Sequence, residues 1–376
     1  MIDFRYHLVS IVAVFLALTV GIVLGTTMLQ DPLLNTLQSE TSDLREESEE
    51  LRGEKDVVDR YSAGGDQLAA AFSDDILADR LAGVRVVVLE SPGVDEELRN
   101  GVVARIEQAG GTVPGRVAFT EKYIDPDQAT FVNELTDQLA AGADLPRGGA
   151  HERAGAELAR AVIDPGTGGE DPAAEDATGF DASAVLAGFT EAGLVAVQGD
   201  PAEQGDIGVV LAPGTVFATT GGSPEPQDGT DSPGNDAMLA LTRALHDAVG
   251  GAVLVGDTGA LGAGGILAEA RAAEEPFSTV DSAGRTAGDV ATVLAVAAAT
   301  ESRAGDYGIG EGVDGFLPDP LPGVRESGAD PQDRRSPPHG DGAEDGGDGS
   351  GADPAGDDAG VGPADRPVRD VETGKG

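Results

Sequence analysis

The longest apolar stretch of the sequence lies at its N-terminus. Residues 8–29 carry no charged side chain. A helix of this length reaches about 33 Å, enough to cross the roughly 30 Å hydrocarbon core of a bilayer. A cleaved signal peptide is the alternative, but its apolar core is shorter and ends in a small-x-small site, which the exit sequence Thr26-Thr27-Met28-Leu29 lacks. We therefore expect residues 1–30 to be an uncleaved transmembrane signal anchor.

A seven-residue repeat of apolar positions follows this segment. It consists of Leu37, Leu44, Leu51 and Val58, each preceded at three residues' distance by Leu34, Thr41, Ser48 or Lys55. Such a repeat is typical of the seam of a coiled coil, and its polar members favour one register over raw stability. The alternative is a single solvated helix packed on its own domain. Because the repeat continues from a membrane helix, we expect residues 31–62 to form a parallel homodimeric stalk.

The membrane segment itself contains one G-x-x-x-G pair, Gly21 and Gly25, which permits close approach of two helices in a bilayer. Polar residues also cluster immediately before the span, at Asp3, Arg5 and His7. Asp3 adds nothing to the positive-inside bias. It either pairs with Arg5 at the interface, or this edge docks a cytoplasmic or membrane protein partner.

Strand-like and helix-like patterns alternate over residues 80–320. Val84–Leu89 predicts a strand buried on both faces, Asp95–Ala109 a helix that ends at a glycine pair, and Val113–Phe119 a second strand. This βαβ unit predicts a parallel sheet. Further strands are expected at 193–197, 207–211 and 252–255, and further helices at 128–141, 152–162, 182–191, 236–249 and 285–300. The sequence thus predicts an α/β fold with a Rossmann-like parallel sheet.

Stretches rich in Gly, Pro and Asp separate or follow these elements. Residues 164–178 and 221–234 are predicted to be exposed loops. Residues 321–376 consist mostly of Gly, Asp, Pro, Glu and Ala, with little to bury. We therefore expect an acidic disordered tail there.

Charge indicates the orientation and the class of partner. Arg5 precedes the span and the next basic residue is Arg45, which favours a cytoplasmic N-terminus and an extracytoplasmic C-terminal domain. The net charge of −43 argues against nucleic acid and against anionic lipid surfaces as partners. The chain has no cysteine, which excludes disulfides, thiolate nucleophiles and cysteine metal sites.

Motifs for catalysis and cofactor binding are scarce. The sequence contains neither a G-x-S-x-G elbow nor a nucleotide P-loop, and His246 beside Asp247 is expected on a helix surface. The loop Gly259–Gly265 matches the dinucleotide-binding spacing only in part, so a tight turn is favoured over an anion site. The Met and His residues are scattered without ligand spacing. We expect no enzyme activity, and no cofactor or metal site can be derived from these residues.

Two parts of the sequence resemble a known family. The opening Met1–Leu18 and its continuation Gly21–Gly25 resemble the start of the actinobacterial MctB family (mycobacterial copper transport protein B). A second match comprises Phe277–Asp281 and then Asp306-Tyr307-Gly308, and the resemblance covers about residues 1–320. It implies a protein of copper homeostasis and efflux in the cell envelope, with an outer-membrane channel as one form. Some members of the family are instead linked to cell separation, as dimeric extracytoplasmic partners of a cytoplasmic protein.

The residues themselves argue against a channel. One helix per chain cannot line a pore without oligomerising, and the strands lack the alternating segments of about ten residues that form a membrane barrel. We therefore expect a membrane-anchored, dimeric, non-enzymatic binding or scaffold protein in copper homeostasis, with copper implied only by the resemblance. The alternative is a structural or regulatory partner in envelope assembly or cell separation that does not bind copper.

Overall fold

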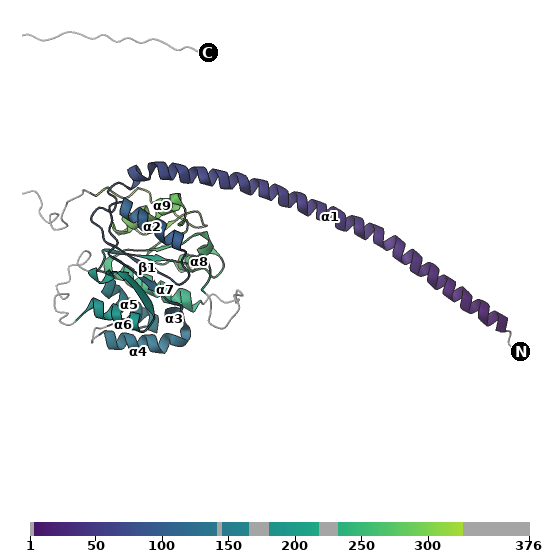
Figure 1. Ribbon diagram of the computed structural model, residues 1–376, viewed down its shortest axis with the longest axis horizontal. Coiled ribbons are helices and arrows are strands. Elements are labelled where there is room, and N and C mark those ends of the chain that lie inside the picture. The colour runs from purple at the N-terminus through teal and green to yellow at the C-terminus, as the bar shows by residue number, and fades with distance from the viewer. Residues whose placement is uncertain (1–3, 141–144, 165–179, 218–231, 326–376) are drawn as a thin grey trace, which may run out of the picture. The chain divides into compact units, whose positions relative to one another are not determined.

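The computed structural model describes residues 4–140, 145–164, 180–217 and 232–325, and no side chains for residues 26–37. Most of the two predicted loops, and residues 326–376 of the predicted tail, lie outside these ranges. In the described part, one long helix leads into an α/β domain with helices on both faces of its sheet (Figure 1).

The long helix, α1 (Phe4–Leu77), contains both the predicted anchor and the predicted stalk. Its segment Phe4–Gly25 has a mean hydropathy of 2.7 and is long and apolar enough to cross a membrane. The helix passes the predicted end of the stalk at residue 62 and continues to Leu77, whose side chain is fully buried. The last turns of α1 are therefore part of the α/β domain.

The sheet of the described residues has seven strands in the order β3-β2-β1-β4-β5-β6-β7. Neighbouring strands are parallel except for β2 and β3, which are antiparallel. The structure therefore confirms an α/β fold with a mainly parallel sheet. The strands are β1 (Val86–Glu90), β2 (Gly115–Phe119), β3 (Val195–Gly199), β4 (Ile207–Leu211), β5 (Ala252–Val255), β6 (Ser278–Val280) and β7 (Asp306–Tyr307).

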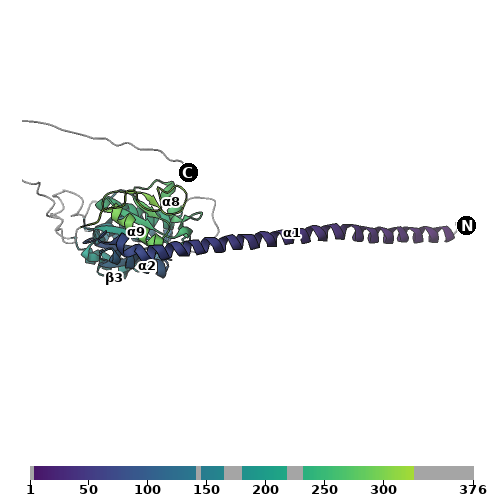
Figure 2. The ribbon, with the colours of Figure 1, turned by 90° about the horizontal axis from the view of Figure 1, so that it is seen from above.

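Helices cover both faces of this sheet. One face packs against the end of α1 and against α2 (Glu96–Gln108) and α9 (Thr286–Ala299), which Figure 2 shows beside the end of α1. The helices associated with the other face are α3 (Glu121–Ile124), α4 (Ala129–Leu139), α5 (Ala150–Val162), α6 (Ala182–Glu191), α7 (Pro233–Val249) and α8 (Ile266–Ala272).

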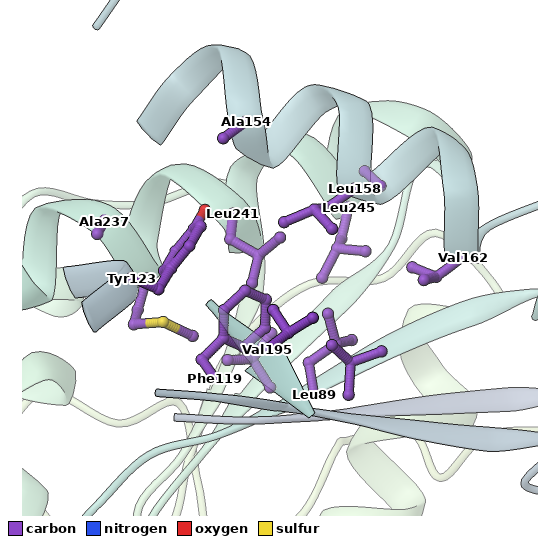
Figure 3. Close-up of a cluster of buried hydrophobic side chains, with 14 of the residues drawn as sticks. Leu89, Phe119, Tyr123, Ala154, Leu158, Val162, Val195, Ala237, Leu241 and Leu245 are labelled. Atoms are coloured by element: carbon purple, nitrogen blue, oxygen red, sulfur yellow. The ribbon is translucent and has the colours of Figure 1, made fainter. Parts of the chain in front are cut away.

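Two apolar clusters hold these layers together. Val86 and Val88 of β1 belong to the cluster under α2 and α9, whereas Leu89 belongs to the opposite one. Figure 3 shows Leu89 beside the strands in this second cluster, with Leu158 of α5 and Leu241 of α7 on the side of the helices. Burial on both faces is what the continuous apolar run of β1 predicts.

Local signals explain where the structure departs from the expected boundaries. α7 begins at Pro233, inside the predicted loop 221–234, because the Ser232 side chain caps the helix and proline is favoured in its first turn. Residues 321–325 also depart from the predicted disordered tail, since the backbone N–H of Arg325 donates to the Asp79 carbonyl at 3.0 Å. The tail prediction for residues 326–376 lies outside the described residues.

Candidate functional site

The N-terminal candidates lie on the exposed surface of α1. Arg5 and His7 are in its first turns, and both are exposed; Asp3 lies outside the described residues. A Cβ atom added to Gly21 or Gly25 would meet no atom within 4 Å. Nothing described in this chain uses the small size of these two glycines, so close packing against another helix stays a prediction.

The predicted seam is also exposed. Leu44, Leu51 and Val58 are 65%, 57% and 64% exposed, while the side chain of Leu37 lies outside the described residues. The described side chains of the seam therefore do not pack on the α/β domain, which was the alternative to a dimeric stalk. A row of exposed apolar side chains is compatible with pairing of two such helices, which stays a prediction.

The last turns of α1 are fixed to the domain by polar contacts. The Oγ of Ser73, which is buried, accepts hydrogen bonds from Arg105 at 3.2 Å and from Gln108 at 3.0 Å, both on α2. Farther toward the membrane end, Asp66 pairs with Arg285, whose Nη2 lies 2.8 Å from Asp66 Oδ2. The exposed seam and the docked end thus belong to the same helix.

The C-terminal end of the described chain lies against the residues that directly follow α1. Arg80, just after α1, donates to the Pro322 carbonyl, and the Gly323 N–H donates to Glu301 at 2.8 Å. Sequence reasoning missed this contact because proline- and glycine-rich composition says nothing about a few backbone hydrogen bonds at the start of a tail.

The structure brings together the two later segments that carry the family resemblance. Asp281, at the end of β6 and fully buried, pairs with Arg271 at 2.8 Å and accepts the N–H groups of Ile309 and Gly310 at 2.8 and 2.9 Å. Gly308 passes so close that a Cβ there would lie 2.0 Å from Asp281 Oδ1. The carboxylate therefore fixes the loop after β7, and this glycine leaves room for it.

Two further contacts complete this cluster. The Arg271 guanidinium donates to the Tyr307 carbonyl at 3.0 Å, and the Thr279 hydroxyl donates to Asp306 at 2.6 Å. Both oxygens of the Asp281 carboxylate are satisfied internally, which indicates a structural role. The family resemblance pointed to the two segments, Phe277–Asp281 and Asp306-Tyr307-Gly308. Nothing in the sequence indicated that Arg271 connects them.

The glycine-rich loop after β5 forms tight turns. Gly259 lies in a 3-10 turn where a Cβ would be 2.2 Å from the Gly214 carbonyl oxygen, and a Cβ on Gly265 would be equally close to that of Ala260. Close backbone packing therefore accounts for these glycines. The helix that follows, α8, has only seven residues.

The helix after β1 is also unsuited to phosphate. Asp95 caps the N-terminus of α2 with its own carboxylate, and Glu96 and Glu97 lie in the first turn. These charges occupy and repel the position where a doubly wound fold binds a pyrophosphate group.

Candidate metal donors are separate in the described part of the chain. No group of three or more His, Asp or Glu side chains there is arranged to hold a metal ion. His151 Nε2 lies 2.7 Å from the Tyr123 carbonyl, and burial lowers the pKa of His151, which favours the neutral ring. Met238 is fully buried in the apolar core, and His246 is half-buried on α7. His339 lies outside the described residues.

Comparison with known proteins identifies relatives that align with this chain over almost their whole length. The sequence is 28% identical to the copper transporter MctB of Mycobacterium bovis and of Mycobacterium tuberculosis over 328 residues, covering 83% of this chain and 98% of each relative. It is also 28% identical to that of Mycobacterium leprae over 331 residues, with the same coverage. The model of the family described as "Copper transport outer membrane protein, MctB" matches residues 1–318, from the N-terminal apolar helix through the last strand of the described sheet. This chain, with its N-terminal apolar helix and mainly parallel sheet, belongs to the MctB family.

Proposed function

We propose that this protein is a dimeric, membrane-anchored scaffold or binding protein of the cell envelope that acts in copper homeostasis without enzymatic activity. The observation that carries the proposal is the exposed apolar seam on α1, between the membrane segment and the α/β domain. The family and the name of its mycobacterial members support the link to copper.

Pairing of two seams explains why leucines at positions 44 and 51 are exposed in a single chain. Full burial of a leucine or valine side chain contributes about 1.5–3 kcal/mol. A parallel pair of α1 helices would bury these side chains in both chains and place both membrane segments on one side, with the α/β domains outside the cytoplasm, as the position of Arg5 favours.

We assign the α/β domain a Rossmann-like topology that acts as a scaffold. The strand order β3-β2-β1-β4-β5-β6 matches that of a doubly wound sheet, although β3 is antiparallel here. Ligands of such sheets bind where the order reverses, which is between β1 and β4 in this chain. The carboxylates at the start of α2 and the close packing of the glycine loop argue against a nucleotide at that point.

A second function, in envelope assembly or cell separation, is favoured because the candidate metal-donor side chains lie apart from one another in the described residues. The described residues of one chain contain no group of three side chains arranged to bind a metal ion. Copper as cargo would therefore be bound by a partner protein or by ligands contributed by both chains of a dimer. The alternative is a structural or regulatory partner in envelope assembly or cell separation that does not contact copper, and a membrane-anchored α/β domain is compatible with that role. Docking of a partner at the cytoplasmic edge, at Asp3, Arg5 and His7, is compatible with both functions.

Sedimentation and thermal unfolding of the full chain in detergent test these proposals. We expect a dimer; a monomer at micromolar concentration would contradict the dimeric scaffold. Unfolding with and without copper then separates the two functions, because a ligand that binds the folded state raises the unfolding temperature. A copper-dependent rise supports copper binding. Unchanged unfolding, together with chained cells and normal copper tolerance in a deletion strain, supports the role in cell separation.

A further inference from the structure

Charged side chains flank the exposed seam of α1 in a regular order. In the seven-residue repeat, labelled a to g with Leu44 at d, positions e and g lie on either side of the seam. Position g is a glutamate at Glu40 and Glu47, and position e is an arginine at Arg45 and Arg52. One flank of the seam is therefore acidic and the other is basic.

A groove along this part of α1 combines the seam with both flanks. Its lining residues are Leu44, Glu47, Ser48, Leu51, Arg52 and Lys55. The two leucines supply apolar surface, and the glutamate and the arginine place opposite charges on the two sides of it. In a parallel coiled coil such a groove receives an apolar side chain of the facing helix.

The flanking charges have no counter-ion among the described residues of the chain. Glu40, Arg45, Glu47 and Arg52 are exposed and form no ion pair there, whereas Lys55 pairs with Asp59 on the same helix. Residues 31–60 contain ten acidic and four basic residues, and three of the four basic ones lie at positions a or e. The few positive charges of this acidic segment are thus concentrated where a second helix would meet them.

The chain's own domain limits how far a second helix can follow the seam. Asp66 and Ser73 occupy the next two e positions of the repeat after Asp59. Asp66 pairs with Arg285 and Ser73 accepts a hydrogen bond from Arg105, so this flank faces α9 and α2 there. The free part of the seam therefore ends before Asp66 and coincides with the part that carries the alternating charges.

We propose that the partner of this surface is a second copy of the chain, selected by pairing of Glu40 and Glu47 with Arg45 and Arg52 across the two helices. The inference rests on the proposed dimer and names the residues that choose its partner. In a parallel pair, position g of one helix faces position e of the next repeat on the other helix. Glu40 then faces position 45 of the second copy, and Glu47 faces position 52.

The pattern fits its own copy better than other helices. Two-fold symmetry repeats each contact, which gives four ion pairs per dimer. An antiparallel pair would place glutamate opposite glutamate and arginine opposite arginine, and a uniformly acidic helix would repel the glutamate flank. Exposed ion pairs contribute little energy each. The leucines therefore hold the two helices together, while the charges select which helices pair.

Exchange of these charges in the full chain, purified in detergent, tests the proposal. One variant combines Arg45→Glu with Arg52→Glu, so that both flanks are acidic. The other combines Glu40→Arg with Glu47→Arg, so that both are basic. Each variant alone should raise the dissociation constant of its dimer by at least about tenfold, because four attractive pairs become repulsive. An equal mixture should form a heterodimer as tight as the wild-type dimer, as measured by sedimentation and native mass spectrometry.

Glu46→Arg combined with Glu50→Arg is the matched control. It changes the net charge as much as the basic variant does, at positions f and c, which face away from the seam. This control should dimerise at least as tightly as the wild type. The side chains changed in all three variants are exposed, so circular dichroism should show an unchanged fold.

The outcomes separate this inference from the proposed dimer. A monomeric wild type would contradict the dimer and this inference with it. A dimeric wild type whose two charge variants pair as tightly as it does would overturn this inference alone. A mixture that does not recover the wild-type affinity would also overturn it, because pairing between positions g and e requires that recovery. So would a control weakened as strongly as the basic variant, since net charge would then explain the loss.

Discussion

At the scale of single residues, the buried pair of Arg271 and Asp281 organises the far end of the sheet. It fixes the loop after β7 to the end of β6 through a carboxylate that has no contact with solvent. A buried pair of this kind is weak support for stability as a whole, but removing one partner leaves an unpaired charge in an apolar surrounding. The cost of breaking it is therefore much larger than the net contribution of the pair.

We expect Asp281→Ala to reduce the free energy of unfolding by about 3–5 kcal/mol, because Arg271 and two backbone N–H groups lose their acceptor. In a domain of this size the unfolding temperature should fall by roughly 10 °C. Asp137→Ala is the matched control: Asp137 pairs with Arg153 at the surface and is half exposed. It should cost less than about 1 kcal/mol. Equal losses in calorimetry would show that the Asp281 cluster has no special role.

Apolar residues were more predictable than polar ones at this scale. Leu98, Val102 and Ile106 follow helical spacing and are buried on α2, as expected. The roles of Asp66, Arg271 and Asp281 depend on partners in other elements of the fold. Periodicity reports which side of an element faces the core, but it contains no information about such pairs.

At the scale of elements, segments with a clear apolar pattern were predicted well, and two very short strands were missed. α2, α5, α6, β4 and β5 lie within a few residues of the expected ranges. β6 was missed because Ser278 and Thr279 interrupt its apolar pattern, and β7 has only two residues. The antiparallel direction of β3 also could not be deduced, since a strand pattern has no direction.

The length of α1 shows tertiary packing overriding local preference. Gly64 and Gly65 each disfavour a helix by about 1 kcal/mol, and the predicted stalk ends before them. The helix nevertheless continues, because Ser73 and Leu77 are buried against α2 and the sheet. A helix end held by its domain tolerates glycines that would end an isolated helix.

The seam on α1 makes a specific prediction at this scale. Leu44→Asp combined with Leu51→Asp should raise the dissociation constant of the dimer by more than about a hundredfold, because four leucines per dimer lose their apolar contact. The measurement is sedimentation of the full chain in detergent. Val57→Asp is the control, since Val57 is 56% exposed but lies outside the seven-residue repeat. A dimer equally weakened by Val57→Asp would argue against a coiled coil.

At the scale of the whole molecule, residues 1–29 are either a tether or a docking element. If they are a docking element, an unrelated single-span anchor of equal length should preserve export, folding and dimerisation but abolish copper tolerance, because Asp3, Arg5, His7 and the Gly21–Gly25 face would be lost. Complementation of a deletion strain on copper plates measures this. Full growth with the exchanged anchor would show that the segment only holds the protein at the membrane.

The contacts of α1 also set an order of events during synthesis. Asp66 is separated from Arg285 by 219 positions, and Arg80 from the Pro322 carbonyl by 242. A nascent chain emerges N-terminus first. The apolar segment and the seam of α1 are therefore synthesised long before Arg285 and Pro322, the contact partners of Asp66 and Arg80. If α1 pairs as proposed, two nascent chains anchored close together can do so before either domain is complete. Assembly on neighbouring ribosomes would then precede folding of the α/β domain. A truncated chain that ends before residue 285 would still be able to join a dimer with a full-length chain and inactivate it.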